Sequence, residues 1–137
     1  MTHKPLDGRL RRLRQVAEEY LKANGYEIVD EDKKLFPYVE PALAALKQGR
    51  LLVFSITEFP STDQFLRPEE LIHIRDDLDE FVRVNTPESD ERIQRVDRVA
   101  LVMCPEDITV LSPVGDIKWL IVKTEDEVPE ELDRLSA

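Results

Sequence analysis

The side chains best suited to chemistry are acids and an imidazole in the segment that follows Pro68. Glu69, His73 and Asp77 recur at i, i+4 and i+8, so on a helix they are neighbours on one face. Carboxylate oxygens and an imidazole nitrogen bind divalent metals, and flanking carboxylates favour the protonated imidazole. The pattern fits a metal site or a titrating histidine. A solvated helix face, which is polar by necessity, accounts for the same pattern, and nothing besides the spacing supports a site.

Other sets of catalytic side chains are missing. The chain has only two histidines, His3 and His73, and no serine in a G-x-S-x-G turn, so a serine hydrolase is not supported. Its four glycines are too far apart for a phosphate-cradling loop. The one cysteine, Cys104, ends a predicted buried strand, where an inert core thiol is common. The sequence leaves enzymatic activity open but leans against it, and we expect no cofactor.

A basic stretch opens the chain. Residues 1–14 have a net charge of +4, although the whole chain has a net charge of −10. Its arginines lie in the first turns of a predicted helix, where they oppose the helix dipole and bring no local benefit. They suit phosphate groups or an acidic partner surface. Alternatively, they dock onto this protein's own acidic surface, within one chain or between two copies.

An irregular segment, Thr57–Arg67, is the best candidate for a functional loop. Its Phe59 and Phe65 are apolar, and apolar side chains in an exposed loop often mark an interface. Alternatively, both fold back to cap the core. The candidate partner-binding residues are therefore Arg9, Arg11, Arg12, Arg14, Phe59 and Phe65.

Hydrophobic spacing predicts the helices and the first strands. Leu13 and Leu21 recur at helical spacing, and Gly25 suits a left-handed helix cap. Pro41 and Pro68 suit the first turns of two further helices. The predicted helices span 7–24, 41–48, 68–81 and 86–94, with a short acidic helix near Pro129, and the first predicted strands span 26–29 and 51–56.

The segment Arg98–Lys123 is the most strongly patterned part of the chain. Apolar residues fill both faces of strands predicted at 99–104, 108–112 and 117–121, and two short turns separate them. Such spacing is typical of an antiparallel meander. The sequence therefore predicts an α+β (or α/β) fold: a single compact domain, residues 1–137, whose mixed sheet of about four to five strands is covered by three or more helices.

Composition narrows the setting of the protein. Apolar residues make up 42% of the chain, enough for a core, and the longest apolar run is far too short to span a membrane. The first residues lack the apolar stretch of a signal peptide, and a single cysteine suits a reducing compartment. We expect a cytoplasmic protein that binds no membrane. The net charge of −10 argues against nucleic acid as a partner, except through the basic first helix.

Two segments resemble a known family. RQVAEEYLKANGYEIV (Arg14–Val29), followed later by RLLVFSIT (Arg50–Thr57), resembles the start of small YraN-like proteins of the restriction-endonuclease fold. In that family a helix ending in a glycine–tyrosine-like turn precedes strands that carry an acid and an E-x-K motif. Here the E-x-K would fall on Ser55-Ile56-Thr57, which cannot hold a divalent metal. The resemblance thus implies a non-catalytic relative.

Taken together, these patterns favour a non-enzymatic, cytoplasmic protein-interaction module, such as a small subunit or adaptor of a larger assembly. Its partner would be another protein or a second copy of the chain. The alternative is a metal-dependent hydrolase centred on Glu69, His73 and Asp77, or a catalytically degenerate member of the restriction-endonuclease-like fold.

Overall fold

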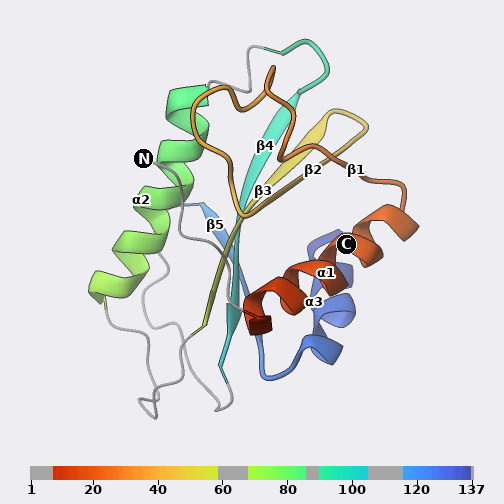
Figure 1. The fold of residues 1–137 in the computed structure, drawn as a ribbon, viewed down its shortest axis with the longest axis vertical. Coiled ribbons are helices and arrows are strands. Elements are labelled where there is room, and N and C mark those ends of the chain that lie inside the picture. Colours follow the sequence, from red (N-terminus) through yellow and green to blue (C-terminus); the bar gives the residue numbers. More distant parts are fainter. Residues whose placement is uncertain (1–7, 59–67, 86–89, 105–115, 137) are drawn as a thin grey trace.

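The computed structural model describes residues 8–58, 68–85, 90–104 and 116–136. Within these residues, one mixed sheet has α-helices on both of its faces, an α+β architecture (Figure 1). The helices are α1 (Gly8–Ala23), α2 (Pro68–Asn85) and α3 (Val128–Ser136), with a 3-10 turn (Glu125–Glu127) before α3. The strands are β1 (Glu27–Ile28), β2 (Leu43–Lys47), β3 (Arg50–Glu58), β4 (Arg95–Met103) and β5 (Ile117–Val122).

The five strands lie in the order β1-β2-β3-β4-β5. β1, β2 and β3 pair antiparallel, whereas β3, β4 and β5 pair parallel, with Phe54 opposite Val99 and Leu101 opposite Leu120. Because parallel strands point the same way, the carboxyl ends of β3, β4 and β5 meet at one edge of the sheet. This edge is where open α/β sheets commonly bind ligands.

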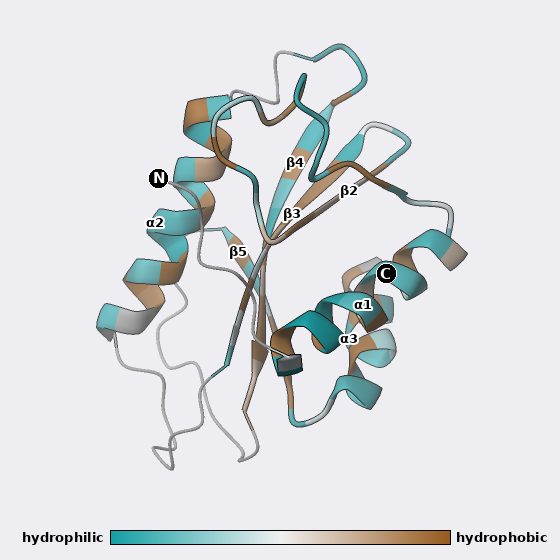
Figure 2. Cartoon of the chain, viewed as in Figure 1, coloured by the Kyte–Doolittle hydropathy of each residue, from teal (hydrophilic) through white to brown (hydrophobic). Residues whose placement is uncertain are grey.

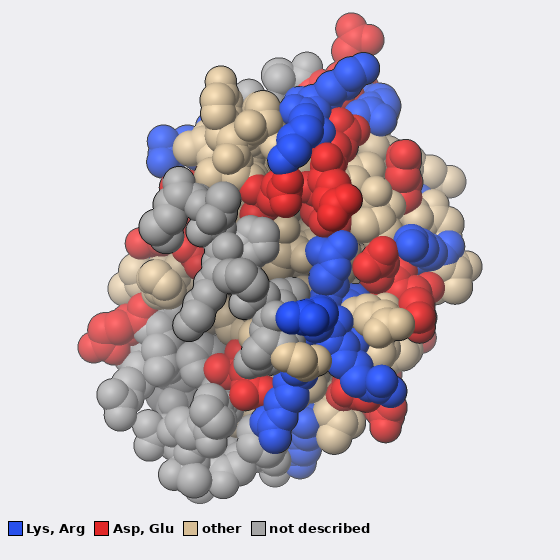
Figure 3. Space-filling view, in the orientation of Figure 1, with Lys and Arg blue, Asp and Glu red and all other residues tan. Residues whose placement is uncertain are grey.

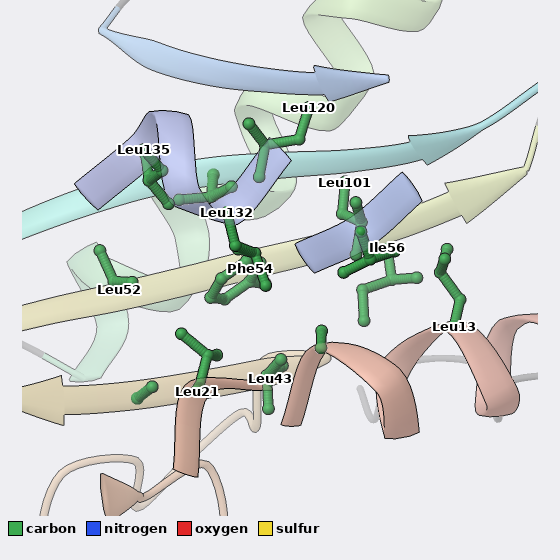
Figure 4. Close-up of a cluster of buried hydrophobic side chains, with 14 of the residues drawn as sticks. Leu13, Leu21, Leu43, Leu52, Phe54, Ile56, Leu101, Leu120, Leu132 and Leu135 are labelled. Atoms are coloured by element: carbon green, nitrogen blue, oxygen red, sulfur yellow. The ribbon is translucent and has the colours of Figure 1, made fainter. Parts of the chain in front are cut away.

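Two apolar cores hold the helices to the sheet. On one face, α1 and α3 pack over side chains of the sheet such as Phe54 and Leu101, which are fully buried (Figure 4). On the other face, α2 packs over Val53 and Val102. Hydropathy follows the same arrangement, because the strands are mostly hydrophobic and the helices turn hydrophilic residues outward (Figure 2).

Helix α1 confirms the first helix predicted from the sequence. Leu13, Ala17 and Leu21, spaced four residues apart, are buried against the sheet and leave the remaining faces polar. Asn24 ends the helix, because its side-chain amide donates a hydrogen bond of 2.8 Å to the Tyr20 carbonyl. Gly25 follows with φ of +89°, the left-handed conformation of a helix cap.

The helix predicted at 41–48 is wrong, since the segment forms strand β2. The prediction rests on Pro41, which suits the first turn of a helix, and alanine and leucine also favour helices in isolation. In the fold all four residues of Leu43–Leu46 are buried, which suits a central strand covered on both faces better than an amphipathic helix. Gln48 and Gly49 have positive φ, as a two-residue hairpin turn into β3 requires.

The predicted antiparallel meander is also wrong. β4 and β5 are direct neighbours and run parallel. Apolar residues on both faces are typical of parallel strands covered by helices, and this reading accounts for the same sequence pattern. The strand predicted at 108–112 lies outside the described residues.

The remaining helix predictions have mixed outcomes. α2 continues to Asn85, so residues 82–84 are helical, and α3 forms near Pro129 with Val128, Leu132 and Leu135 buried. For the helix predicted at 86–94, the described part, residues 90–94, contains a turn. In the described part of the chain, no helix combines the length and the apolar character needed to cross a membrane.

Candidate functional site

The start of α1 presents three arginines to solvent. Arg9, Arg11 and Arg12 are exposed, and the side chains of Arg9 and Arg12 are 71% and 68% accessible. Figure 3 shows basic side chains gathered over the part of the surface where α1 lies, with acidic side chains beside them. The amphipathic spacing of α1 produces this arrangement, because Leu13 and Ala17 turn the opposite face inward.

Two of these arginines pair with distant carboxylates. The Arg9 Nη1 lies 3.3 Å from the Glu58 Oε2, at the end of β3, and the Arg12 Nε donates to Glu125, which begins the 3-10 turn. In both pairs the carboxylate is the less exposed partner, at 18% for Glu58 and 29% for Glu125. The hydrogen bond and charge of Glu125 raise the pKa of Arg12. Such exposed pairs contribute little to stability, so carboxylates of a partner can replace them.

A pocket lies between the start of α1 and the carboxyl ends of the parallel strands. Its volume is about 240 Å³. Met103 supplies an apolar side chain, and Thr124 brings a hydroxyl. The residues that line it are Arg9, Glu58, Met103, Lys123, Thr124 and Glu125. Positive and negative side chains therefore meet at the edge where a parallel sheet commonly binds ligands.

Arg14, the fourth predicted partner-binding arginine, has a different environment. Its Nη2 lies 3.1 and 3.2 Å from the two carboxylate oxygens of Asp30, and its Nη1 donates to the Ala42 carbonyl. The Arg14 side chain is 22% exposed and that of Asp30 only 6%. Glu18 adds a second carboxylate at 3.5 Å from the Arg14 Nε. The structure thus places Arg14 in an internal contact, apart from the exposed arginines.

The candidate metal ligands lie along α2. Among the described residues there is no group of three or more His, Cys, Asp or Glu that could hold a metal ion, and Glu69, His73 and Asp77 do not form one. Burial raises the pKa of Asp77, with a contribution from Glu80 and against the effect of His73. Asp77 thus differs from an ordinary solvated acid. It does not form a metal-binding group with Glu69 and His73, however.

The structure describes only some of the other residues that the sequence analysis singled out. Phe59 and Phe65 lie outside the described residues. Cys104 is buried, as expected of a core thiol. Ser55 is buried and Thr57 half-buried on β3, and among the described residues the buried Thr57 hydroxyl has no hydrogen-bond partner.

Sequence reasoning missed the acidic half of the site. Glu58 and Glu125 are 49 and 113 residues from the arginines they bind, and no local spacing signals such a pair. Lys123 and Thr124 also reach the pocket only through the parallel placement of β5. Comparison of the chain with known protein families, curated proteins and solved structures found no match.

A second charged cluster is structural. Asp97 on β4 accepts hydrogen bonds from Arg50 at 2.5 Å and from Arg95 at 3.0 Å, and Arg50 also reaches the Leu135 carbonyl at 3.3 Å. Burial raises the pKa of Asp97, but the two arginines outweigh burial and hold it below its usual value of 3.8. The cluster ties the amino ends of β3 and β4 to α3.

The lowered pKa of Asp97 predicts a pH dependence of stability. Because the folded chain holds the carboxylate below its unfolded pKa, Asp97 stabilises the fold at neutral pH, and this contribution is lost as pH falls through the folded value. Urea unfolding should show that Asp97→Asn is less stable than wild type at neutral pH and that the difference shrinks below about pH 4. A difference that stays constant from neutral to acidic pH would contradict this assignment.

Proposed function

We propose that this protein is a non-enzymatic interaction module that binds an acidic surface of another protein through Arg9, Arg11 and Arg12. The observation that carries the proposal is the exposure of these arginines at the start of α1, beside the pocket at the carboxyl edge of the parallel strands. Core packing does not account for them, because all three are exposed, and arginines in a first turn oppose the helix dipole.

The charge around the arginines favours a protein over a nucleic acid. The chain has a net charge of −10, and Glu58 and Glu125 lie directly beside the arginines. A long polyanion would meet these acids and the acidic remainder of the surface. A compact acidic patch of a protein can instead contact the three guanidinium groups alone. Arginine also binds carboxylates in a bidentate geometry, which gives such a contact direction.

The alternative proposal is a catalytically degenerate member of the restriction-endonuclease-like fold. Helix α1 ends at Ala23, and Gly25-Tyr26 follow it before the strands β1, β2 and β3. At the E-x-K positions the chain has Ser55 and Thr57, which cannot hold a divalent metal or activate water as carboxylates and a lysine do. Under this alternative, the chain is a relative that keeps a binding role without cleavage.

Affinity capture from the source cells tests the proposal. The full-length chain should retain a stoichiometric protein partner, and reversal of Arg9, Arg11 and Arg12 to Glu should weaken the purified complex about 30-fold or more. The reversal replaces three attractive contacts by repulsive ones. Binding of a nucleic acid in place of a protein, with the same sensitivity to the reversal, would contradict the proposal.

A matched control separates position from net charge. Reversal of Lys22, Arg75 and Arg134 to Glu changes the net charge by the same amount, and all three side chains are at least a third exposed. This control variant should keep affinity within about threefold of wild type, because distant exposed charges are screened by salt. Equal losses in both variants would show that only overall charge matters and would remove the assignment to α1.

A further inference from the structure

The connection between β1 and β2 is much longer than its geometry requires. The two strands are antiparallel neighbours, and such a pair needs a turn of only about two to five residues. Here the chain uses residues 29–42 and forms a loop that rises over the sheet towards one end of α2 (Figure 1). Long loops inside compact folds are usually functional.

The loop is held from within. Leu35 and Phe36 are 1% and 0% exposed and pack in the core beneath α2. Both of their backbone N–H groups donate to the Asp32 carbonyl, at 3.1 and 2.8 Å. These two side chains fix the middle of the loop to the body of the protein.

Arg14 closes the base of the loop. It binds the Asp30 carboxylate at 3.1 and 3.2 Å and donates to the Ala42 carbonyl, so one guanidinium joins the first and last parts of the loop. Asp30 itself is 4% exposed. This buried contact explains why Arg14 differs from the three exposed arginines of α1.

Asn85 clamps the far part of the loop. Its Oδ1 accepts the Tyr38 N–H at 3.1 Å, and its Nδ2 donates to the carbonyls of Val39 and Phe81 at 2.8 and 2.7 Å. The Asn85 side chain is therefore a buried amide that fixes the backbone on both sides of one peptide bond. The side chain that this backbone carries outward is Tyr38.

Tyr38 is the most exposed large hydrophobic residue of the described chain. It is 76% exposed, and the only other such residue in the described ranges is Ile72, at 41%. We propose that loop 29–42 is a preformed recognition loop and that Tyr38 inserts into an uncharged, concave pocket of a folded partner protein. Tyrosine is enriched among the residues that dominate protein interfaces, and a loop fixed in advance loses little entropy on binding.

The surroundings of Tyr38 define the chemistry of the partner. Opposite charges balance around the loop: Lys33 is bound to Glu40, and Arg92 lies 3.5 Å from Asp32. The exposed Glu31 and Lys34 carry one charge of each sign. The contact would therefore be centred on the aromatic ring and its hydroxyl, and it would depend little on salt. Asn85 ends α2 at the amino side of β4, whereas Arg9 and Arg12 lie at the carboxyl edge of the sheet. The inference extends the proposed protein-binding role to a second surface.

The first test asks whether the ring serves stability. If Tyr38 is a contact residue, Tyr38→Ala should leave the urea midpoint and the melting temperature unchanged. Asn85→Ala should lower both, because it removes the hydrogen bonds of a buried amide to the Tyr38 N–H and to the Val39 and Phe81 carbonyls. A clear loss of stability in Tyr38→Ala would overturn the proposal by giving the ring a structural role.

The second test asks what the ring contacts. With Tyr38 replaced by photoreactive p-benzoylphenylalanine in the full-length chain, irradiation of source cells should yield one discrete cross-linked species, with none from the same replacement at Lys34. The purified cross-linked protein should lose about 30-fold in affinity for Tyr38→Ala and much less for Tyr38→Phe, at both low and high salt. A cross-link to a second copy of this chain, the absence of any cross-link, or equal affinity of Tyr38→Ala and wild type would overturn the proposal. Failure of the arginine reversal alone leaves this result intact, so the two proposals are separable.

Discussion

Replacing Asp30 by alanine should lower the free energy of unfolding by about 3 kcal/mol, measured by urea denaturation at neutral pH. Asp30 is 4% exposed and holds two nitrogen–oxygen contacts of 3.1 and 3.2 Å with Arg14. Removal of the carboxylate leaves the Arg14 guanidinium largely buried without its main counter-charge. Removing one member of a buried ion pair is far more destabilising than never having the pair.

The double variant Arg14→Met/Asp30→Leu distinguishes this cause from a general loss of packing. It replaces both charges by apolar side chains and should recover more than half of the stability lost by Asp30→Ala. Glu18→Ala is a control, because Glu18 lies on the more exposed side of Arg14 at 3.5 Å and should change stability by less than about 1 kcal/mol. If the double variant is as unstable as the single one, the buried charge is not the cause.

Replacing Phe54 by alanine should lower the free energy of unfolding by about 3–5 kcal/mol. Phe54 is fully buried at the middle of β3, the central strand, under α1 and α3 (Figure 4). The alanine leaves a cavity that its neighbours on β2 and β4, Leu43 and Val99, cannot fill, because strand pairing fixes their backbone on both sides. Chemical denaturation of the purified variant measures the loss.

Phe54→Leu is the matched control, since it keeps most of the apolar volume and should cost less than about 2 kcal/mol. A loss below about 1 kcal/mol for Phe54→Ala would contradict the burial of this side chain. An unchanged denaturant slope in both variants would show that they unfold from the same compact state.

The amphipathic helices could be predicted from the sequence because each carries its own signals. In α1 the spacing of Leu13, Ala17 and Leu21 gives the buried face, and Gly25 gives the end. In α3, Val128, Leu132 and Leu135 do the same. These signals lie within a few residues of one another, so no knowledge of the rest of the fold is needed.

Strand β2 and the parallel pairing could not be predicted in this way. Leu43–Lys47 contains residues that favour helices, and only its position between β1 and β3 makes it a strand. The direction of β5 depends on how the chain returns after β4, which apolar alternation does not encode. Both errors arise where long-range pairing overrides a local pattern.

In the candidate site too, local signals could be predicted from the sequence and long-range contacts could not. Arg9, Arg11 and Arg12 could be predicted because their charge conflicts with a helix start. Glu58 and Glu125 could not, since the fold brings them to the arginines from the ends of distant elements. Arg14 belongs to the same local run, yet its contacts with Asp30 and Ala42 separate it from the other three.

The salt dependence of the affinity for the captured partner tests the central claim most directly. Isothermal titration from about 50 mM to about 500 mM salt should show affinity falling steeply for wild type, because exposed charge contacts are screened over this range. The variant with Arg9, Arg11 and Arg12 reversed to Glu should bind more weakly at every salt concentration. Its affinity should not fall as salt rises, because salt screens the repulsion that the reversal introduces. Equal affinity and equal salt dependence of wild type and variant would contradict binding through α1.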